Sequence, residues 1–162
     1  MRNNSLYSAL HKPAKAVAFV SGSPKHPSIR GSVRFFGVRG KVFVRAEITG
    51  LPEGTKPCAS PIFAIHIHEG TECTGNETDA FANAGGHYNP YNCLHPYHAG
   101  DMPPLFGVNG SAFSAFLTDR FTIPEILGKA LIIHASPDDF TTQPSGSSGE
   151  KIACGVITAT GK

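Results

Sequence analysis

Residues 63–101 read FAIHIHEGTECTGNETDAFANAGGHYNPYNCLHPYHAGD, and five of the chain's eight histidines lie in this stretch. A short apolar run at its start carries two of them. A long segment dense in Gly, Asn and Pro carries the other three, and an aspartate closes it. Imidazole is the commonest protein ligand for metals such as zinc and copper, so this density of histidine predicts a metal site. The residues concerned are His66, His68, His87, His95, His98 and Asp101.

The first two histidines share one face of a predicted strand. His66 and His68 are two residues apart in the apolar run IFAIHIH, and alternate side chains of a strand leave the same face. Two imidazoles on one face make a bidentate metal site, although two histidines can also occupy such positions without a metal. Residues 70–101 have little regular pattern, and irregular loops of this length in compact domains are usually functional. Metal ligation would supply the order that hydrogen-bonded ladders do not.

The composition is that of a globular chain without a strong net charge. The 162 residues have a mass of 17.1 kDa, are 40% hydrophobic and 16% charged, and carry a formal charge of +2. This length suits one domain with a sizeable core. The small charge argues against nucleic-acid binding, and no apolar run is long enough to span a membrane. We expect a loose N-terminal leader over residues 1–14 and a single domain over residues 15–162.

The N-terminus and the cysteines bear on the cellular compartment. The first twenty residues lack the ordered charge, long apolar core and small-residue cleavage site of a signal peptide, which predicts a cytoplasmic protein by default or a missing export signal. No two cysteines form a CxxC pair, so a zinc ribbon is not indicated. Four cysteines allow three disulfide pairings, and the alternative is four free thiols, the default in the cytoplasm. They are Cys58, Cys73, Cys93 and Cys154.

Short apolar runs between Gly- and Pro-rich turns predict an all-β fold. Val42, Val44, Ala46 and Ile48 alternate along one face of residues 41–48, and most of the other face is charged. Residues 118–128 predict a connection or one helical turn, and no stretch predicts a clear amphipathic helix. Seven or eight short strands with turns between them are typical of a β-sandwich or barrel. Strands are expected at residues 16–21, 29–36, 41–48, 61–68, 112–117, 129–134 and 152–158.

Five segments carry a resemblance to a known family. HIHEG, GGHYNP, HAGDMPPL, LIIHASPDD and GEKIACGVI resemble the signature segments of copper/zinc superoxide dismutases, and they occur in that family's order. The resemblance covers residues 15–160 and indicates a bacterial-type member. It implies an eight-stranded Greek-key β-barrel, an immunoglobulin-like sandwich, with the site on its outer face under two long functional loops.

The resemblance also implies a copper site and a zinc site that share one ligand. His87 resembles the histidine that bridges the two metals. Asp138, four residues after His134, resembles the carboxylate that hydrogen-bonds ligands of both metals, and such partners fix the tautomer and orientation of an imidazole. By resemblance, the copper ligands are His66, His68, His87 and His134, and the zinc ligands are His87, His95, His98 and Asp101.

Lys151 and the cysteines complete the resemblance. Lys151 stands where the family has an arginine, so it keeps the positive charge but replaces a rigid fork by one mobile ammonium. Cys73 and Cys154 resemble the family's disulfide pair. Cys58 and Cys93 remain, and a second bridge between them is a weaker prediction. The short spacing from His95 to His98 also departs from the family's usual pattern.

The function implied by the resemblance is the disproportionation of superoxide to dioxygen and hydrogen peroxide. His87 would leave copper to carry a proton, and Lys151 would draw the anion to the metal. The alternative is a non-catalytic member of the family, a barrel that holds structural zinc or carries copper. The expected partner is the small-molecule substrate, with no nucleic acid and no membrane insertion, and a homodimer is compatible with the family. Disulfides would favour an oxidising or extracytoplasmic compartment.

Overall fold

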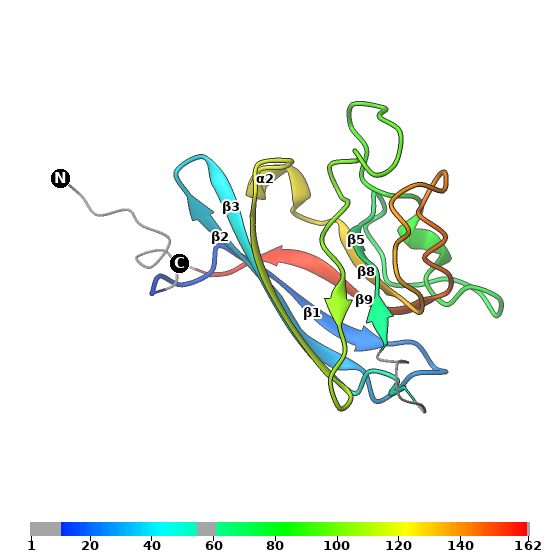
Figure 1. Ribbon diagram of the computed structural model, residues 1–162. Helices are drawn as coiled ribbons and strands as arrows, with labels where there is room; N and C mark the ends of the chain where they lie inside the picture. Colours follow the sequence, from blue (N-terminus) through cyan, green and yellow to red (C-terminus); the bar gives the residue numbers. More distant parts are fainter. Residues whose placement is uncertain (1–10, 55–60, 162) are drawn as a thin grey trace.

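The computed structural model describes residues 11–54 and 61–161, which form a strongly curled antiparallel sheet (Figure 1). Seven strands lie in the order β5-β8-β9-β1-β2-β3-β7. Neighbours that are distant in sequence, such as β3 with β7 and β9 with β1, give the Greek-key connections that were predicted. The strands are β1 (Ala16–Gly22), β2 (Arg30–Val38), β3 (Lys41–Thr49), β5 (Ile65–Ile67), β7 (Ser111–Thr118), β8 (Ala130–His134) and β9 (Lys151–Ala159). The all-β prediction is therefore confirmed.

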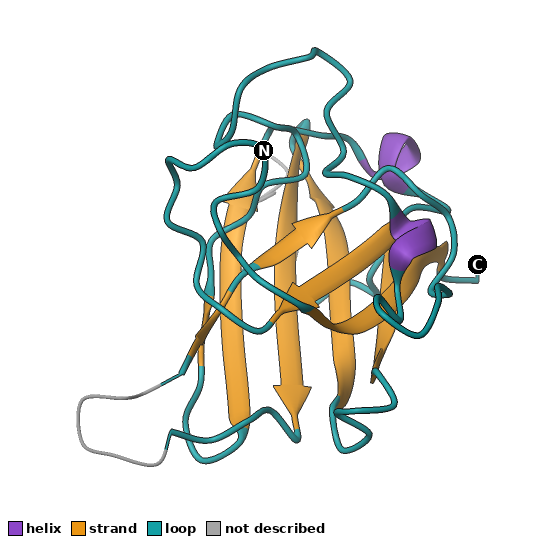
Figure 2. Cartoon of the chain, turned by 90° about the vertical axis from the view of Figure 1, so that its right-hand side faces the viewer, coloured by secondary structure: helices purple, strands orange, loops and turns teal. Residues whose placement is uncertain are grey.

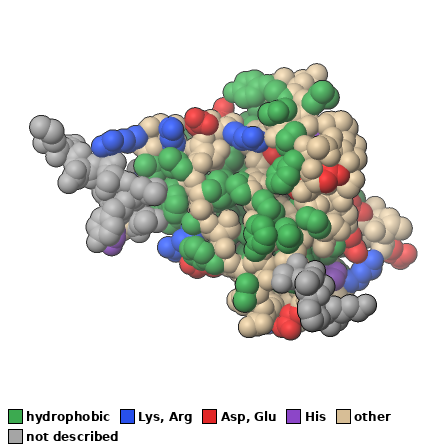
Figure 3. All heavy atoms as spheres, in the orientation of Figure 1, with side chains coloured by type: hydrophobic (Ala, Val, Ile, Leu, Met, Phe, Trp, Pro, Cys, Tyr) green, Lys and Arg blue, Asp and Glu red, His purple; other side chains and the backbone are tan. Residues whose placement is uncertain are grey.

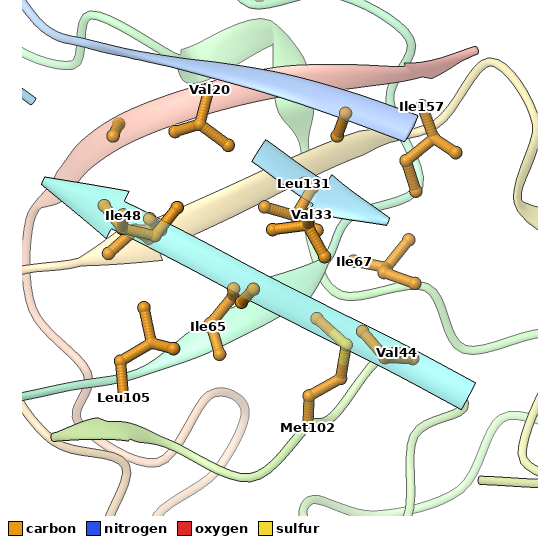
Figure 4. Close-up of a cluster of buried hydrophobic side chains, with 14 of the residues drawn as sticks. Val20, Val33, Val44, Ile48, Ile65, Ile67, Met102, Leu105, Leu131 and Ile157 are labelled. Atoms are coloured by element: carbon orange, nitrogen blue, oxygen red, sulfur yellow. The ribbon is translucent and has the colours of Figure 1, made fainter. Parts of the chain in front are cut away.

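The core fills the concave side of the sheet. The alternation predicted for β3 is present, since Val42, Val44, Ala46 and Ile48 are each at most 3% exposed. Figure 4 shows how apolar side chains from several strands converge on one cluster, with Met102 from the loop region closing one side. The backbones of β9 and β1 approach each other closely at Gly155. A Cβ on this residue of β9 would lie 2.5 Å from the Phe19 carbonyl oxygen of β1. Only glycine lets these two strands pair there.

The strand predicted over residues 61–68 is divided in two. Ile62–Phe63 (β4) pairs with Leu105–Phe106 (β6) in a separate two-stranded sheet, whereas β5 pairs with β8 in the main sheet. Ala64 lies at the change of direction, where its N–H donates to the Ser136 carbonyl at 2.9 Å. The prediction of a single strand over residues 61–68 is wrong because its first part pairs with β6 and its second part pairs with β8. The division places β5 next to β8, which both carry histidines.

Two long loops lie beside one another at the end of β5 and β8. They are residues 68–104, which contain the short 3-10 helix η1 (Ala82–Ala84), and residues 135–150. Both are visible on the right of Figure 1, and Figure 2 shows loops crowded over one part of the sheet. The predicted helical turn is present as α2 (Ile123–Ile126), whose first turn is closed by a capping box between Thr122 and Glu125. The two loops carry most of the predicted site.

One face of the molecule shows how the charged side chains are distributed (Figure 3). On the face shown in Figure 3, acidic and basic side chains are sparse and mixed, without a continuous basic area. Within residues 11–54 and 61–161, no helix combines the length and the apolar character needed to cross a bilayer. The predicted leader extends beyond this range, since residues 1–10 lie outside the described part of the chain.

Candidate metal centre

The structure gathers the predicted ligands into two groups that share His87. Each residue offers one ligand atom, and within each group these atoms lie within 4.8 Å of one another. Every member of both groups is buried. The four-histidine group is His66, His68, His87 and His134, and the mixed group is His87, His95, His98 and Asp101.

Backbone pairing brings the ligands together from segments far apart in the sequence. His66 lies in β5 and His134 ends β8, and these two strands are antiparallel neighbours. Isolated β-bridges pair His66 with Asp101 and His68 with His87. The loop is thus paired with β5 and with His68, the residue that follows it, and this pairing brings the ligand atoms of each group within 4.8 Å of one another.

Two histidines of the first group have their outer ring nitrogens fixed by carbonyl groups. His68 Nδ1 lies 2.8 Å from the Gly85 oxygen, and His134 Nδ1 lies 3.2 Å from the Gly149 oxygen. A carbonyl oxygen can only accept, so each Nδ1 carries the proton and each Nε2 presents a lone pair. These two Nε2 atoms are 3.3 Å apart. Two lone pairs facing each other at this distance repel, and a cation coordinated by both removes the repulsion.

Asp138 fixes one histidine of each group in the same way. Its two carboxylate oxygens lie 2.8 Å from His66 Nε2 and 2.8 Å from His95 Nε2. Both rings donate to the carboxylate, so their Nδ1 atoms carry no proton, and these two atoms are buried without a hydrogen-bond partner among residues 11–54 and 61–161. Burial alone would raise the pKa of Asp138, but hydrogen bonds from His66, the Phe140 N–H and His95 lower it to about 2. The carboxylate therefore stays charged as an acceptor for both rings.

The mixed group has the dimensions of a tetrahedral zinc site. With zinc bonds of about 2.0–2.1 Å, neighbouring ligand atoms of a tetrahedron lie about 3.3–3.4 Å apart. Here His98 Nδ1 is 3.4 Å from His87 Nδ1 and 3.5 Å from Asp101 Oδ2. His95 Nδ1 is 3.1 Å from the same Asp101 oxygen, Oδ2, whereas His87 Nδ1 is hydrogen-bonded to the other oxygen, Oδ1, at 2.7 Å. The donor set and its spacing fit a closed site for one zinc ion.

His87 faces both groups with one ring. Its Nδ1 belongs to the mixed group, while its Nε2 is buried on the side of the other three imidazoles and has no hydrogen-bond partner among the described residues. Unpartnered buried ring nitrogens are costly unless a proton or a metal engages them. His66 Nδ1, His95 Nδ1 and His87 Nε2 are all of this kind, so the residues present fit two metal ions.

Burial favours the neutral form of four of the ligand histidines, and this is the form that binds metals. Desolvation lowers the pKa of His66 and His98, and lowers the pKa of His68 far below its ordinary value. Desolvation, with the neighbouring His66 ring, lowers the pKa of His134 to about 3. Burial opposes the charged form of Asp101, but its hydrogen bond with His87 and the surrounding rings lower its pKa. Zinc and copper bind neutral imidazoles and ionised carboxylates, so these pKa shifts favour metal binding.

Lys151 lies at the wall of the pocket that leads to the four-histidine group. This pocket has a volume of about 700 Å³ and is lined by His68, His87 and His134, among others. The Lys151 ammonium donates to Asp79 Oδ2 at 2.7 Å and to the Phe81 carbonyl at 3.2 Å. The mobile lysine expected from the sequence is thus held in place on two sides. Asp79 was missed by sequence reasoning, because a partner 72 residues away leaves no local signal.

The comparison with known proteins decides the family. A family model described as copper/zinc superoxide dismutase (SODC) matches residues 29–157, most of the chain. The chain belongs to the copper/zinc superoxide dismutase family. It is 32% identical over 142 residues to Cu-Zn superoxide dismutase 2 of Aquifex aeolicus, a match that covers 78% of each chain. It is 34% identical over 142 residues to a Cu-Zn superoxide dismutase of Legionella pneumophila, covering 83% of this chain and 80% of the relative.

A solved structure supports the fold of this family member. The Cu/Zn superoxide dismutase from Brucella abortus superposes with a TM-score of 0.72 at 23% identity, covering 88% of this chain and 99% of the other. The copper/zinc superoxide dismutase fold predicted from the sequence is confirmed. Membership of this family also implies copper and zinc as cofactors, which agrees with the two groups of ligands described above.

The disulfide implied by the resemblance is present in this copper/zinc superoxide dismutase family member. Cys73 and Cys154 are bonded, with their Cα atoms 5.6 Å apart. The bond joins the first long loop to β9, three residues beyond Lys151, so one segment is held to one strand by the disulfide and by the Asp79–Lys151 ion pair. The predicted Cys58–Cys93 pairing falls outside the described residues because Cys58 lies in the undescribed range 55–60.

Proposed function

We propose that this protein is a superoxide dismutase, which converts two superoxide ions and two protons to one dioxygen and one hydrogen peroxide. The observation that carries the proposal is a pair of buried ligand groups joined through the single imidazole of His87. Support also comes from the family and from the names of its relatives in Aquifex aeolicus and Legionella pneumophila. The pocket is lined by three histidines of the four-histidine group, His68, His87 and His134, which gives a small anion access to that group.

We assign zinc to the mixed group and copper to the four-histidine group. Three imidazoles and one carboxylate make a closed four-coordinate set, which is typical of structural zinc. Four imidazoles suit copper, and His68, His87 and His134 border the pocket, so a small ligand has access from that side. Bound copper would supply the one-electron chemistry, taking an electron from one superoxide ion and giving it to the next. The protein's own residues guide the anion and deliver one of the two protons, and the second proton comes from water.

His87 is placed to hold and deliver a proton. Its Nδ1 is fixed by the mixed group, with Asp101 at 2.7 Å, so the ring keeps its orientation whatever its Nε2 is bound to. The ring borders the pocket, and its Nε2 is buried with no hydrogen-bond partner in the described part of the chain. When Nε2 is not engaged by copper, it is free to take a proton and donate it to the reduced substrate. This gives His87 a catalytic role besides its role as a ligand.

Lys151 is placed to attract and orient the anion. Two of the three ammonium hydrogens are engaged by Asp79 and the Phe81 carbonyl, which leaves one donor for a ligand in the pocket. The side chain is only 16% exposed, so its charge is less screened than that of a surface lysine. Asp79 fixes the ammonium and also offsets part of its field. We assign the anion-guiding role to Lys151, at the position of the family's arginine.

The disulfide bears on the compartment in which this chemistry takes place. Structural disulfides persist in oxidising environments and are rare in the cytosol. The Cys73–Cys154 bond lies against buried residues of the fold, since Cys154 is only 3% exposed. We assign the protein to an oxidising, extracytoplasmic compartment on this ground.

The test is metal loading followed by assay of the rate of superoxide decay. Metal-free protein is reconstituted with zinc alone and then with zinc and copper, and metal content is measured on the same samples. Acceleration of superoxide decay is expected only after copper is added. His134→Ala should retain zinc and lose the activity, whereas His26→Gln, outside both ligand groups, should retain both. Protein that binds zinc and copper but does not accelerate decay would indicate the non-catalytic member of the family.

A further inference from the structure

Gln143 makes a two-point contact with the backbone of His95. Its side-chain Oε1 accepts from the His95 N–H at 2.9 Å, and its Nε2 donates to the His95 carbonyl at 2.8 Å. One side-chain amide thus satisfies both backbone polar groups of a single residue, as a neighbouring strand would. Gln143 belongs to the loop of residues 135–150 and His95 to the other long loop, 48 residues earlier in the sequence.

The same loop also holds the His95 ring. Asp138 accepts from His95 Nε2 at 2.8 Å, and Gly146 packs directly over this contact. A Cβ on Gly146 would lie 2.0 Å from Asp138 Oδ1 and 2.8 Å from His95 Nε2, and the residue adopts a φ of +67°, so glycine is required there on both grounds. His95 is therefore enclosed by loop 135–150 at its ring and at its backbone.

Loop 135–150 forms part of the wall of the pocket over the four-histidine group. Gln143, Ser145, Ser148 and Gly149 line this pocket, and the Gly149 carbonyl orients His134. Internal hydrogen bonds close the loop on itself, from the Asp139 N–H to the Gly146 carbonyl at 2.9 Å and from the Gly146 N–H to the Thr142 carbonyl at 2.7 Å. The segment that clasps His95 and the segment that borders the pocket are thus one folded unit.

We propose that Gln143 is a positioning residue that couples occupancy of the mixed ligand group by zinc to the ordering of the loop that walls the copper pocket. This inference rests on the zinc site proposed above. A zinc ion bound to His95 restricts the His95 backbone, and Gln143 transmits this restriction to loop 135–150. Conversely, an ordered loop 135–150 keeps His95 in the position in which it can bind zinc. Coupling of this kind is reciprocal, so loop order strengthens zinc binding by the factor with which zinc favours loop order.

Zinc affinity of copper-free protein is the first readout. Gln143→Ala removes both hydrogen bonds, and Gln143→Glu keeps the size of the side chain but sets a carboxylate oxygen against the His95 carbonyl. Both variants should bind zinc about tenfold more weakly than the wild type, between the effects of one and of two net hydrogen bonds. Thr141→Ala is the matched control, because its hydroxyl contacts Asp139 in the same loop and not His95. It should change zinc affinity by less than about twofold.

Amide hydrogen exchange is the second readout, and it separates coupling from a general loss of stability. In the wild type, zinc should slow exchange of the Asp139 and Gly146 amides in loop 135–150 and of the Gly100 and Asp101 amides near the zinc ligands. In Gln143→Glu, zinc should still slow exchange at Gly100 and Asp101, but its effect at Asp139 and Gly146 should fall by about tenfold. Equal protection of Gly146 by zinc in wild type and variant would overturn the inference and leave the zinc site intact. A wild type that binds no zinc would overturn both.

Discussion

Loss of the Cys73–Cys154 disulfide should destabilise the metal-free protein by about 4–5 kcal/mol. The bond joins residues 81 positions apart, and closing a loop of that length removes about 15 cal/mol/K of entropy from the unfolded chain, or about 4.5 kcal/mol at 25 °C. Cys73→Ala is the better substitution, because Cys154 is 3% exposed in an apolar cluster with Ala130 and Ile132, and its replacement would also disturb packing.

Urea unfolding of metal-free protein, with the midpoint and slope both determined, measures this loss. Oxidised wild type is compared with Cys73→Ala and with wild type kept reduced, and the last two should agree because they lack the same bond. The loop should remain against β9 through the ion pair of Asp79 with Lys151, so the native state should change little. The unfolded chain without the cross-link is less compact and exposes more surface, so the midpoint should fall and the slope should rise. A loss of less than about 1 kcal/mol in both samples would show that the bond does not constrain the unfolded chain as reasoned.

Three further predictions concern charge and protons at the pocket. Asp79→Asn should raise the rate constant for superoxide by about twofold and make it fall more steeply with salt, because the substitution removes a negative charge 2.7 Å from the Lys151 ammonium. Stopped-flow rates that do not change with this substitution would contradict the anion-guiding role of Lys151. Lys151→Glu should slow the reaction strongly and flatten or reverse the salt dependence, whereas Lys151→Arg should keep or raise the rate. Copper binding at pH 6.0 should release less than one proton in total from His66, His68 and His134, because burial lowers the pKa of His66, lowers that of His68 well below 6.5 and lowers that of His134 to about 3. Three unperturbed imidazoles with a pKa of about 6.5 would release about two protons. Calorimetry in buffers of different ionisation enthalpy counts these protons, and release of two would refute the lowered pKa values.

The sequence predicted those features that depend on local pattern or on recurrent motifs. Alternation alone located β3, and its four inward residues are all in the core. The spacing of His66 and His68 on one strand face predicted that they would act together, and both lie in the four-histidine group. The resemblance supplied His134, since no local pattern could relate a histidine at the end of β8 to a strand 66 residues earlier.

The remaining features depend on contacts between distant segments. The change from β4 to β5 at Ala64 is set by β6, a two-residue strand too short to show a period. The Asp79–Lys151 pair joins residues 72 positions apart and forms because the fold brings the first loop to β9. His68 and His134 are fixed by the backbone carbonyl groups of Gly85 and Gly149. A backbone carbonyl is present in every residue, so the sequence gives no indication of which ones contact a histidine. These contacts could be identified only from the three-dimensional structure.

The most direct test of the proposed function is the decay of superoxide after pulse radiolysis, recorded with zinc-loaded protein before and after one equivalent of copper is added. The account predicts no acceleration with zinc alone, fast decay that is first order in superoxide and in copper-loaded protein, and no acceleration in the His134→Ala variant with zinc retained. Fast decay in the His134→Ala variant, or none in wild type shown by metal analysis to hold both ions, would contradict it.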